Sequence, residues 1–124
     1  MTVLVAYRAC PHGEAAVRTA LEESRRRDLP LQVLVLDEQD PDAGPSAALA
    51  AVLGDAAVEI AYRDEHTEPA DAILDRADDV GASLVVVGSR KRSSQGTFLM
   101  GTTTQRVLLD ASVPVLVVKD AYDS

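Results

Sequence analysis

Five short apolar runs, each followed by a segment of different character, constrain the fold more than any other feature of this sequence. The runs cover residues 2–7, 31–37, 57–63, 83–88 and 113–119. Several of them are apolar at consecutive positions and rich in Val, which is typical of strands that are covered on both faces. The sequence therefore predicts strands that lie inside a layered domain.

Helical patterns fill the segments between these runs. Apolar side chains recur near helical spacing in 14–27 and 69–82, and the segment 102–111 has the same character. A shorter helix is expected over 46–54, after a loop at 38–45 that is rich in Asp, Pro and Gly. Alternating strands and helices give a parallel sheet with right-handed crossovers. We expect one α/β domain over residues 1–124, with five strands.

Composition limits the classes of function. No apolar run approaches the length of a membrane span, and the first ten residues have the character of a first strand instead of a signal peptide. The single cysteine, Cys10, rules out an internal disulfide and favours the cytoplasm. A net charge of -8 argues against direct binding of nucleic acid, because a phosphate backbone requires a basic face.

Hydroxyl, glycine and basic residues gather directly after the fourth run, in the stretch 88–106. Ligands of open α/β sheets bind beyond the carboxyl ends of the strands. The next helix should begin near Gly101 or Thr102, where free N–H groups and the helix dipole favour an anion. The stretch therefore predicts phosphate binding. The residues expected to contribute are Gly88, Ser89, Arg90, Lys91, Arg92, Gly101, Thr102 and Thr103.

A simpler interpretation of the same stretch stays open. The three consecutive cations could be a solvated loop, and Thr102 or Thr103 could only cap a helix. The spacing is not that of a Walker loop, because no Gly-Lys-Ser/Thr follows a four-residue gap.

The glycine spacing resembles the signature of the universal stress protein family, which is Gly, two residues, Gly, nine residues, then Gly with Ser or Thr. This chain has Gly88, Lys91 in the place of the second glycine, and Gly101-Thr102, with both gaps kept. The opening VLVAYRACPHGEAAVRTAL, the stretch GASLVVVGS and the exit QRVLLDASVPVLVVK are similar to the family as well. The resemblance covers the whole chain.

The resemblance implies a Rossmann-like open sheet in the order 3-2-1-4-5, with helices on both faces. It also implies a bound adenine nucleotide, ATP or AMP, or another phosphorylated ligand, and Mg²⁺ could accompany ATP. By position, the end of the first strand would line the ribose and base, and Val35 would offer backbone groups to the adenine edge. The resulting candidate site comprises Ala6, Tyr7, Arg8, Val35, Gly88, Ser89, Arg90, Lys91, Gly101, Thr102 and Thr103.

Two departures from the family pattern bear on this site. Arg8 replaces an aspartate, and a guanidinium group cannot accept a hydrogen bond from a ribose hydroxyl. Lys91 brings a side chain where nucleotide-binding members have a glycine. Both changes add positive charge, so they either meet the phosphates of a ligand held differently or mark a member without nucleotide binding.

Catalytic and metal sites have little support in the sequence. Cys10, at the start of the first helix, is best explained as a small capping residue, although a helix N-terminus can activate a thiol. A zinc site at Cys10, His12 and Glu14 lacks a second cluster, and no serine has an evident base. Asp37 is the best-placed acid for Mg²⁺, and we expect it to cap or turn the chain instead.

The last apolar run predicts a partner. In the order 3-2-1-4-5 it lies at an edge, where Val113 to Val118 have little protection beyond Pro114 and Lys119. The resemblance also implies pairing of these strands across a two-fold axis. We therefore expect a homodimer that binds a small phosphorylated ligand in stress response. The alternatives are a dimerisation or protein-interaction module without nucleotide and, more weakly, a slow nucleotide hydrolase.

Overall fold

The computed structural model describes residues 1–37, 44–56, 58–89 and 101–119. They form a five-stranded parallel sheet in the order β3-β2-β1-β4-β5. The strands are β1 (Thr2–Tyr7), β2 (Leu31–Val35), β3 (Glu59–Tyr62), β4 (Ala82–Gly88) and β5 (Val115–Val118). The predicted fold class and strand order are confirmed.

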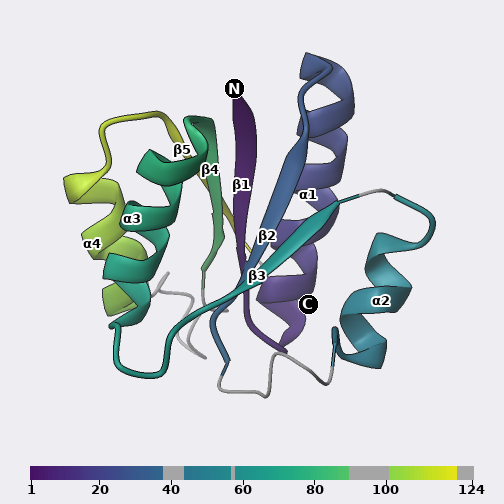
Figure 1. Ribbon diagram of the computed structural model, residues 1–124, viewed down its shortest axis with the longest axis horizontal. Helices are drawn as coiled ribbons and strands as arrows, with labels where there is room; N and C mark the ends of the chain where they lie inside the picture. The colour runs from purple at the N-terminus through teal and green to yellow at the C-terminus, as the bar shows by residue number, and fades with distance from the viewer. Residues whose placement is uncertain (38–43, 57, 90–100, 120–124) are drawn as a thin grey trace, which may run out of the picture.

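The helices are α1 (Pro11–Arg27), α2 (Ala47–Leu53), α3 (Pro69–Val80) and α4 (Thr102–Asp110). They cover the two faces of the sheet, α1 and α2 on one side and α3 and α4 on the other (Figure 1). Helix α1 begins three residues before the predicted boundary, because Pro11 is pre-organised for the first helical turn. Strands β3 and β5 are shorter than the apolar runs that predict them.

The core has two layers that follow from the alternation of strand side chains. Val3, Val5 and Tyr7 of β1 point toward α1 and α2, whereas Leu4 and Ala6 point toward α3 and α4. Strand β1 lies at the centre of the sheet, and all of its residues from Val3 to Tyr7 are buried. Burial on both faces explains the continuous apolar run in the sequence.

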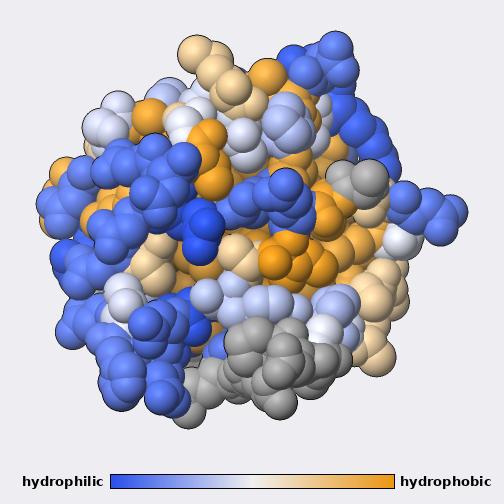
Figure 2. Space-filling model, viewed as in Figure 1, coloured by the Kyte–Doolittle hydropathy of each residue, from blue (hydrophilic) through white to orange (hydrophobic). Residues whose placement is uncertain are grey.

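The surface in the orientation of Figure 1 is divided by polarity. Hydrophilic side chains gather over α3 and at the carboxyl end of α1, and apolar surface appears between them over β2 and β3 (Figure 2). No helix in the described part of the chain is long and apolar enough to cross a membrane.

Candidate functional site

A pocket of about 380 Å³ opens at the carboxyl ends of β1 and β4. These strands are neighbours in the sheet, yet the chain leaves them toward opposite faces, to α1 after β1 and to α4 after β4. This is the switch point at which open α/β sheets bind ligands. The described residues that line the pocket are Ala6, Arg8, His12, Gly13, Leu36, Ile73, Val87, Gly88, Gly101, Thr102, Thr103 and Thr104.

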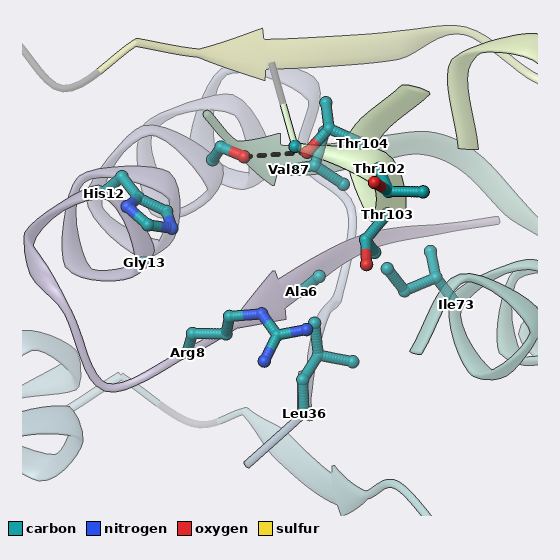
Figure 3. Close-up of a pocket in the computed structure, with 12 residues that line it drawn as sticks. Ala6, Arg8, His12, Gly13, Leu36, Ile73, Val87, Thr102, Thr103 and Thr104 are labelled. Carbon is teal, nitrogen blue, oxygen red and sulfur yellow. Dashed lines mark hydrogen bonds between the residues drawn. The ribbon is translucent and has the colours of Figure 1, made fainter. Parts of the chain in front are cut away.

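Six of the predicted site residues lie in this lining: Ala6, Arg8, Gly88, Gly101, Thr102 and Thr103. Figure 3 shows that they come from both sides, with Arg8 on one side of Ala6 and the threonines of α4 on the other. Residues far apart in the sequence are thus brought together as predicted. Arg90 and Lys91 lie outside the residues that the structure describes.

Three predicted residues are placed elsewhere. Tyr7 and Val35 are buried in the core layer of α1 and α2, on the opposite face of the sheet from Ala6 and Leu36. Ser89 is buried as well, and its backbone N–H donates to the carbonyl of Val118 at 2.9 Å. The carbonyl of Val35 accepts a hydrogen bond from the N–H of Arg63 at 2.9 Å.

Two glycines allow the first turn of α1 to approach the sheet. A Cβ added to Gly13 would lie 2.8 Å from the amide nitrogen of Arg8, and one added to Gly88 would lie 2.9 Å from the carbonyl carbon of His12. Real Cβ contacts are not this short, so both positions require glycine for packing. The first glycine of the sequence motif therefore serves the contact between β4 and α1.

The amino end of α4 opens into the pocket. Its first intrahelical bond runs from the N–H of Gln105 to the carbonyl of Gly101 at 3.0 Å, so the N–H groups of Thr102, Thr103 and Thr104 precede it. Gly101 is the N-cap and supplies no capping side chain. Free N–H groups and the positive end of the helix dipole make this a favourable place for an anion.

Thr104 fixes this helix end to the strand. Its hydroxyl donates a hydrogen bond of 3.1 Å to the carbonyl of Gly88 (Figure 3), and the residue is 6% exposed. This hydrogen bond therefore connects Gly88, the first residue of the glycine motif, to the first turn of the helix that follows the motif. Thr103, which also lines the pocket, is half-buried.

Among the described lining residues, Arg8 alone has a permanently charged side chain, and none is a carboxylate. It makes no ion pair with a described carboxylate. Its guanidinium group points into the pocket beside Leu36 (Figure 3). In a chain of net charge -8, the pocket is thus positive on this side.

Asp37 holds the loop that follows β1. Its Oδ2 accepts a hydrogen bond of 2.7 Å from the N–H of Ala9, across to the end of β2. The contact joins the loop after β1 to the end of β2 and gives Asp37 a structural role. It is not among the residues that line the pocket.

Cys10 is the N-cap residue of α1 and makes no side-chain cap. Its Sγ lies 3.5 Å from Nδ1 and 3.3 Å from Nε2 of His12. Near-equal distances to both ring nitrogens place the sulfur against the face of the imidazole, not in line with one N–H. In the described part of the chain, no group of three or more His, Cys, Asp or Glu residues could hold a metal ion.

Arg106, the fourth cation of the stretch 88–106, serves the packing of α4 on α3. Its guanidinium contacts Asp71 at 2.7 Å and Glu68 at 3.3 Å. The hydrogen bond and charge of Asp71 raise the pKa of Arg106; burial opposes them, and Asp110 and Glu68 add smaller contributions that raise it. This cation is therefore engaged away from the pocket.

Six residues of the pocket lining were not predicted as site residues from the sequence: His12, Gly13, Leu36, Ile73, Val87 and Thr104. Strand alternation carries a signal for part of this set, because Ala6 and Arg8 share one face of β1 and Leu36 follows the same face of β2. The same alternation argues against the side chain of Tyr7, whereas the prediction for Val35 concerns backbone groups, which alternation of side chains does not test. Ile73 and Thr104 depend on how the helices pack, which sequence spacing does not specify.

A family model and a curated relative point to the same family. The model of the universal stress protein family matches residues 1–119. A universal stress protein of Mycolicibacterium smegmatis is 34% identical over 125 residues, which cover 94% of this chain and 96% of that protein.

Solved structures agree with this match. A universal stress protein from Archaeoglobus fulgidus superposes with a TM-score of 0.79 and 31% identity, over 96% of this chain and 98% of that one. Another structure of the universal stress protein from that organism, in complex with dAMP, has a TM-score of 0.72 and 27% identity over the same shares.

Proposed function

Since this chain belongs to the universal stress protein family, we propose that it binds an adenine nucleotide in the pocket between β1 and β4. The observation that carries the proposal is the uncapped amino end of α4, which faces a pocket whose described lining contains a guanidinium group and no carboxylate. Such a lining favours phosphate over neutral ligands. The dAMP complex of a 27% identical relative supports the same class of ligand.

The pocket has room and character for a nucleoside as well as for phosphate. Ala6, Leu36, Ile73 and Val87 give it an apolar wall, and its volume of about 380 Å³ lies within the range of small-molecule sites. The base and ribose would contact this wall, and the phosphate would lie at the N–H groups of Thr102 and Thr103. An inorganic anion alone would leave the apolar wall unused.

Calorimetric titration with ATP, AMP and inorganic phosphate, at low and high salt, tests the proposal. We expect saturable binding of the nucleotides, weaker at high salt, and much weaker binding of phosphate alone. Lys91→Ala tests whether this lysine contributes. If its charge contacts the phosphates, the substitution should lower the affinity for ATP more than the affinity for AMP. No binding of either nucleotide by a folded protein would contradict the proposal.

We propose further that the chain forms a homodimer through its last strand. Strand β5 lies at the edge of the sheet, and its four residues are half-exposed. The neighbouring helix exposes Leu108 at 39% and Leu109 at 82%. An apolar edge strand of this kind favours pairing with a second strand.

The same apolar edge also supports the second candidate function, which is a dimerisation or protein-interaction module without nucleotide. A dimer that binds no nucleotide in the titration would favour it. For the hydrolase the described residues offer no such observation, because Asp37, its best-placed acid, is not among the lining residues.

A further inference from the structure

The arginines in the described part of the chain differ in what they contact. Arg63 donates to the carbonyls of Leu36 and Thr67, each at 2.8 Å, and Arg106 pairs with Asp71. Arg8 has no such hydrogen bond or ion pair with a described side chain, and its guanidinium points into the pocket (Figure 3). A half-buried guanidinium with five donors is best satisfied by an anionic group that accepts two of them.

Within the described lining, anions are therefore favoured at two separate places. One is the amino end of α4, at Thr102 and Thr103, and the other is Arg8, on the far side of Ala6 (Figure 3). A nucleoside 5′-phosphate satisfies one of these places. A longer 5′ chain extends from the same oxygen atom, so it adds charge at that end and not beyond the ribose.

The ribose environment argues for a second phosphate on the sugar. No carboxylate is among the described lining residues to accept hydrogen bonds from ribose hydroxyls. In dinucleotide-binding α/β folds, an acidic residue selects a free 2′-hydroxyl, and an arginine accommodates a 2′-phosphate. Arg8 directly follows the central strand β1, a different position in the fold, but the same chemistry applies to a guanidinium group that faces a ribose.

We propose that this pocket selects a nucleoside that carries phosphates on both sides of its ribose, one on the 5′ oxygen and one on the 2′ or 3′ oxygen. The 5′-phosphate lies at the amino end of α4, and the second phosphate pairs with Arg8. This inference rests on the proposed nucleotide site and adds its substrate class and the residue that determines it.

Isomers that differ in where the second phosphate is attached provide the test; the bisphosphates are more highly charged than ADP, because both of their phosphates are monoesters. ADP and adenosine 3′,5′-bisphosphate contain the same two phosphates, either in one chain or on two sides of the ribose, and adenosine 2′,5′-bisphosphate places the second group one carbon away. Titration at a fixed salt concentration should give about ten-fold or tighter binding of a bisphosphate than of ADP, the size expected for a charge-assisted contact.

Arg8→Ala should remove this preference and weaken a bisphosphate more than AMP, because the contacts of the 5′-phosphate at α4 stay. Arg8→Lys should keep part of the preference, since an ammonium group offers charge without the bidentate geometry. The matched control is Arg18→Ala, which removes the same charge from an exposed position on α1 and should change nothing. Circular dichroism of each variant checks that it folds.

Failure of this inference differs from failure of the nucleotide site. Equal affinities for ADP and both bisphosphates, with AMP binding intact, would overturn the role of Arg8 and keep the proposed function. Equal losses of AMP and bisphosphate in Arg8→Ala would overturn it as well. No binding of any nucleotide would overturn both.

Discussion

Gly88, at the end of β4, lies directly against the backbone of His12, in the first turn of α1. A Cβ on Gly88 would meet the His12 carbonyl carbon at 2.9 Å and its Cδ2 at 3.1 Å. The carbonyl of Gly88 also accepts the hydroxyl of Thr104. The tip of one strand is therefore in contact with the amino ends of both α1 and α4, which form two walls of the pocket.

Gly88→Ala should destabilise the protein by about 1–3 kcal/mol, because the backbone of α1 must move to admit the methyl group. The displacement should also weaken nucleotide binding. Chemical denaturation measures the first effect and titration the second. Gly81→Ala is the control, since nothing lies within 4 Å of its added Cβ and its cost comes from a φ of +62. It should lower stability and leave nucleotide affinity unchanged.

Ala6→Leu should block the nucleotide site. Ala6 is 6% exposed and forms the wall between Arg8 and the threonines of α4, so a larger side chain would occupy the space of the ligand. We expect nucleotide affinity to fall at least about ten-fold, with a loss of stability of about 1–3 kcal/mol from overpacking. Ala48→Leu, at an exposed position on α2, should keep both properties. Unchanged affinity in Ala6→Leu would mean that the ligand lies elsewhere.

Arg106→Gln should weaken the contact between α3 and α4 without touching the pocket lining. The pKa of Arg106 is raised in the folded state, so its stabilising contribution is fully present below the ordinary arginine pKa and is lost only above the folded value. The guanidinium therefore stays charged across neutral pH, and its titration should not contribute to the effect of the substitution on stability there. It should shrink at high salt, because these groups are partly exposed. Thermal unfolding in a salt series measures it, and an effect that grows with salt would contradict the ion-pair explanation.

Val117→Pro should separate dimerisation from folding. Ladder bonds from Val85 N–H to Pro114 and from Ser89 N–H to Val118 show which carbonyls of β5 face β4. In a parallel ladder, the N–H groups of Val115 and Val117 then point to the open edge. Proline at 117 removes a donor from that edge and leaves the pairing with β4 in place.

Analytical ultracentrifugation should find a folded monomer for Val117→Pro and a dimer for the unaltered protein. Val118→Pro is the contrasting variant, since its N–H belongs to the ladder with β4 and its loss should destabilise the sheet. A dimer that persists in a folded Val117→Pro would place the interface on another surface.

Much of the fold could be predicted from the sequence, because burial on both faces leaves a strong pattern in β1, β2 and β4. The site was harder to predict. Glycine spacing located the rim at Gly88 and Gly101, and position along the chain located Arg8. Position along the chain alone placed Tyr7 and Val35 at the site; the side chain of Tyr7 lies on the other face of the sheet, and the backbone contact expected of Val35 stays a prediction. Thr104 and Ile73 reach the pocket through the packing of α4 and α3, a three-dimensional relation that no local pattern encodes.

The contact between Gly88 and His12 has a consequence for how related sequences are compared. A residue fixed by packing is retained whether or not a relative has kept its ligand, so a glycine aligned with position 88 does not distinguish a nucleotide binder from a chain that has lost the activity. The positions that are informative about the ligand are those at which the fold tolerates different side chains. In this chain we expect them to include Arg8, where a change of charge should alter the ligand and leave the scaffold intact.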